Sequence, residues 1–214
     1  CHKSPVQRLW PLIPALVLLA AWQLAWSLGW FPTGTVPSPA AVANGFADEL
    51  ASGRLATDII ASLYRVSVGY VGAVLLAVPL GLWVGRTRWA SAALLPWVNF
   101  FRSMSPIAWI PFAIVWFGIG DPPAIFIIAM ATFFQMTLAT MAATLQVPAV
   151  YYRVATELGM SKRRTLFAVT LPAIMPQLLV SLRLAIGVAW MVVVAAEMIG
   201  VRGGLGFLII DARN

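Results

Sequence analysis

Charge is scarce in this sequence. Asp, Glu, Lys and Arg together make up 10% of its 214 residues, whereas hydrophobic residues make up 61%. A soluble domain of ordinary composition has roughly half of its residues apolar and about a quarter charged. The sequence therefore excludes an ordinary soluble domain. It predicts a chain that faces lipid, with room for about five or six membrane spans of ~20 residues each.

Cysteine and histidine are also scarce, since each occurs once, as Cys1 and His2. A single cysteine excludes an internal disulfide and a cysteine-based zinc site, and we expect no metal site. The sequence also has no P-loop glycine-lysine motif, no carboxylates paired at a workable spacing and no nucleophile beside a histidine. We therefore expect no catalytic residues, no enzymatic activity and no cofactor bound by this chain.

Five apolar segments are long enough to cross a bilayer: residues 9–29, 66–84, 90–117, 124–143 and 166–196. For the first, a cleaved signal peptide is the alternative, although its apolar run is longer than an h-region. Pro106 and Pro111 interrupt the third. Residues 31–46 are rich in turn formers and the part that follows, to residue 58, carries charges, so together they predict an external loop with a short helix. We expect residues 1–58 to form an N-terminal transmembrane helix with this loop, and residues 59–214 to form the core.

The formal net charge is +7, and the positions of the basic residues decide what this charge means. Eight of the fourteen fall in the N-terminus and in alternate connections: Lys3, Arg8, Arg86, Arg88, Arg153, Lys162, Arg163 and Arg164. Six of the seven acids fall elsewhere. The positive-inside rule then places the N-terminus and residues 85–90 and 144–165 in the cytoplasm, with residues 30–58, 118–123 and 197–214 outside. Topology explains the charge, so we expect no nucleic-acid partner.

One cytoplasmic connection, within residues 144–170, is longer than the ~2–8 residues that join most helices in bundles. Its pattern predicts a short helix that is stopped at Gly159, followed by a second helix that starts near Ser161 and ends at Pro172. A projecting helix-turn-helix of this kind is suited to docking on a cytoplasmic partner.

This connection contains a set of small and apolar residues at fixed spacing: Ala155, Gly159, Val169, Leu171 and Pro172. The spacing resembles the EAA loop of binding-protein-dependent ABC importer permeases, whose form is E-A-A-x3-G-x9-I-x-L-P. Arg153, Val154 and Val169 stand here in place of the glutamate, the first alanine and the isoleucine. The match is therefore partial at its start and complete at the glycine and the Leu-Pro pair.

Further blocks are similar to the nitrate, sulfonate, taurine and bicarbonate branch of these permeases. They are SPIAWIPFAIVWFGIG (105–120), LPAIMPQLLVSLRLAIGVAWMVVVAAEMIG (171–200) and the final GGLGFLIIDARN. The resemblance runs from about Leu63 to Asn214. Permeases of this kind continue beyond the DARN segment into one more span, so five spans and a missing sixth are expected here.

The resemblance implies an all-α polytopic bundle of the type I ABC importer permease fold, in the inner or plasma membrane. It implies a homodimer, cytoplasmic ATP-binding cassette subunits that bind ATP and Mg, and a periplasmic or lipid-anchored solute-binding protein. It also implies that the connection is an ATPase-coupling loop, carried by Arg153, Ala155, Glu157, Gly159, Leu171 and Pro172.

Five residues inside or beside the apolar segments are candidates for a translocation path: Arg102, Ser105, Pro106, Arg183 and Glu197. Arg183 lies eleven residues beyond Pro172, roughly 16 Å into a helix and so near the bilayer centre. It either attracts an anionic substrate or is satisfied by a neighbouring helix, and Arg102 either contacts substrate or snorkels to the interface. The break at Pro106, beside Ser105, either exposes backbone groups to a cavity or is a packing kink. Glu197 either contributes to an external gate or dimer contact, or is an ordinary carboxylate at a helix end.

The sequence thus predicts the permease subunit of an ATP-driven importer that moves a small anion of the nitrate, bicarbonate, sulfonate or taurine class. Two alternatives remain. The first is a channel or secondary carrier without an ATPase. An inverted repeat in the sequence would favour this alternative. The second is a membrane scaffold, although an inert anchor need not carry a proline-broken span or an arginine within the membrane.

Overall fold

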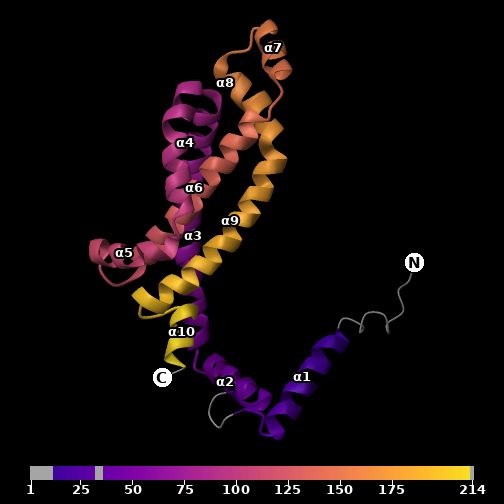
Figure 1. Ribbon diagram of the computed structural model, residues 1–214, viewed down its shortest axis with the longest axis vertical. Coiled ribbons are helices and arrows are strands. Elements are labelled where there is room, and N and C mark those ends of the chain that lie inside the picture. Colours follow the sequence, from indigo (N-terminus) through magenta and orange to yellow (C-terminus); the bar gives the residue numbers. More distant parts are fainter. Residues whose placement is uncertain (1–11, 32–35, 213–214) are drawn as a thin grey trace, which may run out of the picture. The chain divides into compact units, whose positions relative to one another are not determined.

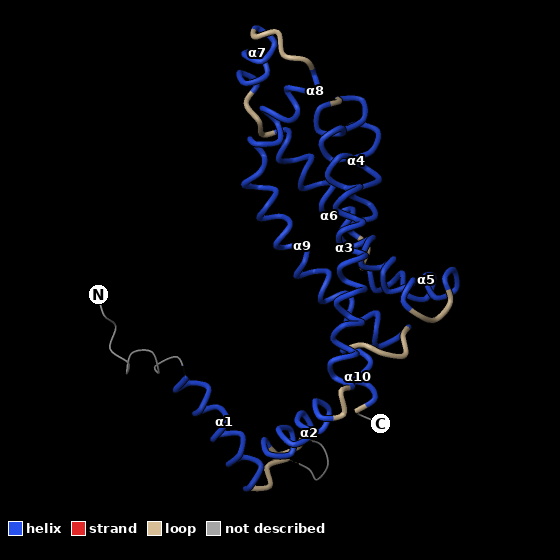
Figure 2. The backbone as a smooth tube through the Cα atoms, turned by 180° about the vertical axis from the view of Figure 1, so that it is seen from behind, coloured by secondary structure: helices blue, strands red, loops and turns tan. Residues whose placement is uncertain are grey.

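The computed structural model describes residues 12–31 and 36–212 of the chain. Cys1, His2 and the start of the first predicted span at Leu9 lie outside the described residues. The described part is helical, without strands, as predicted (Figures 1 and 2). Its helices are α1 Leu12–Ser27, α2 Pro39–Ala51, α3 Arg54–Arg86, α4 Arg88–Ser103, the 3₁₀ helix η2 Pro106–Trp109, α5 Ile110–Phe117, α6 Asp121–Leu145, α7 Ala149–Glu157, α8 Lys162–Thr165, the π-helical η3 Leu166–Thr170, α9 Leu171–Gly200 and α10 Leu205–Asp211.

The chain forms two compact units, residues 1–56 and residues 57–214. In the first unit, α1 is an apolar helix of 16 residues, and α2 is a short helix within the polar segment. Ser38 begins α2 because its hydroxyl accepts a hydrogen bond from the Ala41 amide at 3.1 Å, and Pro39 takes the first helical position, where a missing N–H does no harm.

Within residues 12–31 and 36–212, three helical stretches are long and apolar enough to cross a membrane: Arg54–Arg86, Asp121–Leu145 and Lys162–Gly200. The third predicted span, 90–117, is not one straight helix. It forms a pair, Arg88–Ser103 and Pro106–Phe117, bent by 88°. The residue before a proline avoids the α conformation, and Ser105 accordingly has extended backbone, with ψ of 125°. Pro106 therefore starts a new helix in a new direction.

Helix α3 approaches α6 closely because three of its glycines face that helix. A Cβ atom added at Gly69, Gly81 or Gly85 would lie 2.9, 2.7 or 2.8 Å from its nearest atom on α6. The threonines of α6 on this face, such as Thr137 and Thr140, are buried by the contact. A side chain larger than hydrogen at these positions would push the two helices apart.

Helix α9 runs along α6 in both views of the backbone (Figures 1 and 2). The main buried cluster joins α6 and α9 to α3 and α5, with Ile128, Val193, Val66 and Ile110 among its members. This core places the end of α4, the bend at η2 and the middle of α9 around α6.

The prediction that the helix beginning near Ser161 ends at Pro172 is wrong, because helical structure continues from Lys162 to Gly200. The reason is the π-helical turn Leu166–Thr170, which ends two residues before Pro172. Proline lacks the amide hydrogen that an α-helix needs at this point. A change of hydrogen-bond register at a π-bulge lets the helix pass such a residue without ending.

Candidate functional site

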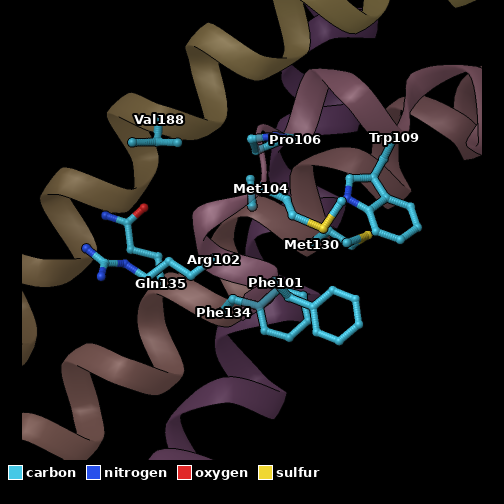
Figure 3. Close-up of a pocket in the computed structure, with 10 residues that line it drawn as sticks. Phe101, Arg102, Met104, Pro106, Trp109, Met130, Phe134, Gln135 and Val188 are labelled. Carbon is cyan, nitrogen blue, oxygen red and sulfur yellow. The ribbon is translucent and has the colours of Figure 1, made fainter. Parts of the chain in front are cut away.

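A pocket of about 270 Å³ opens where α4, η2, α6 and α9 meet. Arg102 in the last turn of α4 and Gln135 of α6 supply its polar side chains (Figure 3). Aromatic rings form the other side, where Phe101 stacks on Phe134 with ring centroids 5.1 Å apart. In Figure 3 the side chains of Arg102 and Gln135 extend toward the α9 side of the pocket, away from these rings.

The donors of the pocket are suited to an anion. Arg102 carries a permanent positive charge, and the Gln135 amide donates hydrogen bonds. The indole nitrogen of Trp109 is buried and has no hydrogen-bond partner among the described residues. None of the described residues that line the pocket is acidic. An oxyanion that enters would meet donors without a competing carboxylate.

The structure brings only some of the predicted path residues together. Arg102 and Pro106 line the pocket, and the bend that Pro106 makes is what places them there. Ser105 is exposed beside the bend and is not a lining residue. Arg183 is exposed on α9 and makes no hydrogen bond or ion pair with any described residue. Within the described chain, neither a carboxylate nor a carbonyl of a neighbouring helix satisfies it.

Glu197 does not line this pocket. It lies where the segments predicted to be outside the membrane meet, and its side chain is fully buried. Its carboxylate accepts a hydrogen bond from the Ser62 hydroxyl at 2.6 Å and pairs with the Arg65 guanidinium at 2.7 Å. Its second oxygen accepts a hydrogen bond from the Gly206 amide at 2.9 Å. Buried charges are stable only when paired and hydrogen-bonded in this way.

Arg65 extends this cluster to two further segments, and we refer to the whole as the Arg65–Glu197 network. Arg65 donates to Asp121 at the start of α6 at 2.8 Å and to the Gly203 carbonyl at 2.8 Å. Asp58 accepts a hydrogen bond from the Gly204 amide at 2.7 Å. The network therefore fastens the connection between α9 and α10 to α3 and α6.

The predicted coupling loop, residues 144–170, which we refer to as the coupling segment, contains α7, and α7 ends in a Schellman motif. The Gly159 amide donates to the Thr156 carbonyl and the Met160 amide donates to the Ala155 carbonyl, both at 2.9 Å. Gly159 has a φ of +66°, as this motif requires. An added Cβ would meet nothing within 4 Å, so glycine is needed here for its backbone conformation and not for space.

The predicted coupling residues occupy different surroundings. Ala155 is buried, with 2% of its surface exposed, whereas Arg153 and Glu157 are exposed on α7. Leu171 and Pro172 are not on α7 but begin α9, beyond the π-helical turn. The hydroxyls of Tyr152 and Thr170, 3.4 Å apart, link α7 to that turn.

One face of α7, continued by its C-cap residue, exposes apolar side chains: Val150, Tyr151, Val154 and Leu158, with 55%, 51%, 47% and 72% of their surfaces exposed. Their spacing places them along one side of the helix. The opposite side, with Tyr152 and Thr156, faces the end of α3 and the start of α4. An apolar face on a short polar-flanked helix is typical of a surface that a partner covers.

These features define a class: a multi-pass helical membrane protein with a broken span around an anion-compatible pocket and a projecting helix with an uncovered apolar face. The chain belongs to the family of binding-protein-dependent transport system inner membrane components, whose model matches residues 77–214. It is a permease subunit of an ABC importer, as the sequence predicted.

The relatives agree with the predicted branch. A protein of Brucella melitensis described as a probable ABC transporter permease is 41% identical over 191 residues, which cover 86% of this chain and 77% of the relative. The nitrate import permease of Synechocystis is 33% identical, covering 95% and 76%. The taurine transport permease of Escherichia coli is 31% identical, covering 99% and 82%. Permeases named for aliphatic sulfonates and bicarbonate are also related.

The fold agrees as well. A chain in an inward-facing structure of the MetNI methionine ABC transporter matches with a TM-score of 0.64 at 23% identity, over 76% of this chain and 82% of that one. At this identity the match shows the fold alone. It confirms the predicted type I permease architecture.

Proposed function

We propose that this permease moves a small anion into the cytoplasm by alternating access, driven by ATP hydrolysis in separate ATP-binding cassette subunits. The substrate class is an oxyanion or sulfonate, as the names of the nitrate, bicarbonate and taurine relatives suggest. The pocket supports this class because its charged lining residue is Arg102 and its amide donor is Gln135. ATP and Mg belong to the partner, and this chain binds no cofactor of its own.

One observation supports coupling to an ATPase: the exposed apolar face of α7. Val150, Val154 and Leu158 would seat in a cleft of the ATPase, flanked by exposed Arg153 and Glu157. The buried Ala155 holds α7 against the membrane core, and Gly159 sets where α7 ends. Leu171 and Pro172 lie on the continuous helix to which this segment passes its movement.

We propose the predicted orientation, with the N-terminus in the cytoplasm, and the arrangement of the core supports its part of it, in which the basic connections at residues 85–90 and 144–165 share one side. The basic turn at Arg86 and Arg88 and the basic segment at Lys162 line one common cavity, so they lie at one end of the core. The Arg65–Glu197 network joins the predicted outer segments of α6 and α9. A solute-binding protein would deliver substrate at that second end, and a second copy of the permease would complete the path as a homodimer.

A double substitution on α7 tests the coupling surface. We expect V154D/L158D to abolish co-elution of the permease with its ATPase and to remove stimulation of ATP hydrolysis by the loaded binding protein, because two carboxylates would have to be buried in an apolar cleft. The measurement is size-exclusion chromatography of the co-expressed subunits, followed by an ATPase assay.

The matched control is V42D/L50D on α2, where a valine and a leucine eight residues apart are also exposed, at 45% and 57%. On the proposed orientation α2 is on the other side of the membrane, so ATPase association should be unchanged. Normal association of V154D/L158D would refute the docking surface. A permease that never binds an ATPase but passes solute in liposomes would establish a channel or carrier instead.

The pocket gives a separate prediction. Arg102→Gln should raise the KM for the transported anion roughly 10- to 150-fold, because a charge-assisted hydrogen bond contributes about 1.5–3 kcal/mol. Arg183→Gln removes the same charge from an exposed site outside the pocket and should change KM little. Uptake by proteoliposomes with ATPase and binding protein measures both. Equal effects of the two substitutions would argue against a substrate site at the pocket.

A further inference from the structure

A second, larger cavity lies at the coupling end of the core and plays no part in the proposed transport path. It has a volume of about 880 Å³ and lies between the α3–α4 turn, the end of α6, α7 and α8. Small-molecule sites typically have volumes of about 300–1,000 Å³. In Figure 1 α7 and α8 lie together at one end of the core. The cavity is therefore large enough to hold a headgroup-sized ligand.

The charged residues of this cavity all have one sign. Arg86 and Arg88 come from the α3–α4 turn and Lys162 comes from the start of α8. None of the described residues that line the cavity is acidic. All three side chains are exposed, and none forms an ion pair with another described residue. Three cations converge here from two separate segments, without a counter-charge within the described chain.

Other lining groups favour a phosphate-type anion over a simple halide. The Arg86 guanidinium lies over the Tyr152 ring, 5.8 Å from its centroid, which orients the guanidinium. The hydroxyls of Ser91 and Thr156 also line the cavity and supply neutral donors. Arginine is suited to bind phosphate through two parallel hydrogen bonds, and lysine binds it as a point charge. Several oxygens on one ligand could satisfy these donors together.

The cavity is distinct from the ATPase-docking surface. Tyr152 and Thr156 lie on the side of α7 that faces the cavity, whereas Val154 and Leu158 are on the uncovered side. A ligand in the cavity would therefore be enclosed by the permease itself, between α7 and the α3–α4 turn. Trp89 lies at the start of α4, next to the α3–α4 turn, and is exposed. Exposed tryptophans are typical of a membrane interface.

We propose that this cavity binds the phosphate group of an anionic ligand and so ties the coupling segment to the α3–α4 turn. Basic pockets between membrane helices on the cytoplasmic side are suited to anionic lipid headgroups. A phospholipid headgroup and a free phosphate share the chemistry that the cavity recognises. The ligand would resist separation of α7 from α3, and the composition of the membrane would thereby adjust the coupling of the transporter.

The experiment compares two double variants of the purified permease that carry the same change in charge. R86Q/K162Q removes two cations of the cavity, and R163Q/R164Q removes two exposed cations that do not line it. The melting temperature is followed as phosphatidylglycerol, phosphatidylcholine or inorganic phosphate is titrated into protein in detergent micelles. If Arg86→Gln prevents folding, because Arg86 also contacts Tyr152, R88Q/K162Q makes the same charge change without losing that contact.

We expect phosphatidylglycerol, but not phosphatidylcholine, to raise the melting temperature of the wild type and of R163Q/R164Q. The half-saturating concentration should be roughly 20- to 30-fold higher for R86Q/K162Q, since each basic residue near an anionic surface contributes about a factor of five. A rise with inorganic phosphate as well would identify a free-anion site of the same chemistry. Equal responses to the two lipids and none to phosphate, or equal responses of the two double variants, would overturn the proposal.

Discussion

Glu197→Ala is expected to destabilise the permease by about 3–5 kcal/mol and to abolish transport. The substitution leaves the Arg65 guanidinium, whose side chain is only 5% exposed, without its buried carboxylate partner, so that only the half-exposed Asp121 pairs with it. It also removes the acceptor for Ser62 and for the Gly206 amide. The loss of melting temperature in detergent and the loss of uptake in proteoliposomes measure the effect.

Asp121→Asn is the control within the same network. Asp121 also binds Arg65, at 2.8 Å, but its side chain is 50% exposed, so solvent screens the pair. The expected destabilisation is below about 1 kcal/mol. The double variant R65M/E197M should be less destabilised than the sum of its single variants, because both charges of the buried pair are removed together and the remaining Asp121 is half-exposed. If Glu197→Ala were no more destabilising than Asp121→Asn, the network would not hold this end of the core together.

Gly81→Val should prevent α3 from reaching α6 and should leave little folded permease in the membrane. A Cβ at Gly81 would lie 2.7 Å from both the Thr137 carbonyl and the Thr140 Cβ, neither of which belongs to a flexible side-chain end. Overpacking a core costs about 1–3 kcal/mol or more, and valine adds two methyl groups beyond that first atom. Fluorescence-detected size-exclusion chromatography of the tagged protein measures the folded fraction.

Gly72→Val is the control, because it makes the same substitution on the same helix at a position where an added Cβ would meet nothing within 4 Å. We expect a normal yield of folded Gly72→Val protein. A normal yield for Gly81→Val as well would show that the α3–α6 approach is not tight. A failure of both would point to the loss of glycine itself and not to the contact.

Several features could be predicted because they depend on local chemistry. The length of apolar runs predicted the three described helices that are long and apolar enough to cross a membrane, since backbone groups in lipid must be satisfied within the segment. Gly159 was correctly placed at the end of α7, because a helix commonly stops at a glycine with positive φ. Pro106 was predicted to break its span, although the 88° bend follows from packing that a sequence pattern does not contain.

Other features depend on partners far apart in the chain. Arg65 precedes an uncharged run and was not predicted to be buried, because its partner Glu197 is 132 residues away. Asp58, Ser62 and Asp121 were missed for the same reason. A single charged residue at the edge of each of two apolar segments, one basic and one acidic, is a signal that could have suggested the pair. The continuation of the helix past Pro172 was missed because periodicity does not reveal a π-helical turn.

The unbroken stretch from Lys162 to Gly200 contains 39 residues and so is roughly 58 Å long. This is nearly twice the ~30 Å of bilayer hydrocarbon. One end belongs to the coupling segment, and the other carries Glu197 and leads into the connection held by Arg65. On the proposed coupling to an ATPase, this helix would act as a lever longer than the membrane is thick. A small rotation of the coupling segment would then become a larger displacement of the end that carries Glu197.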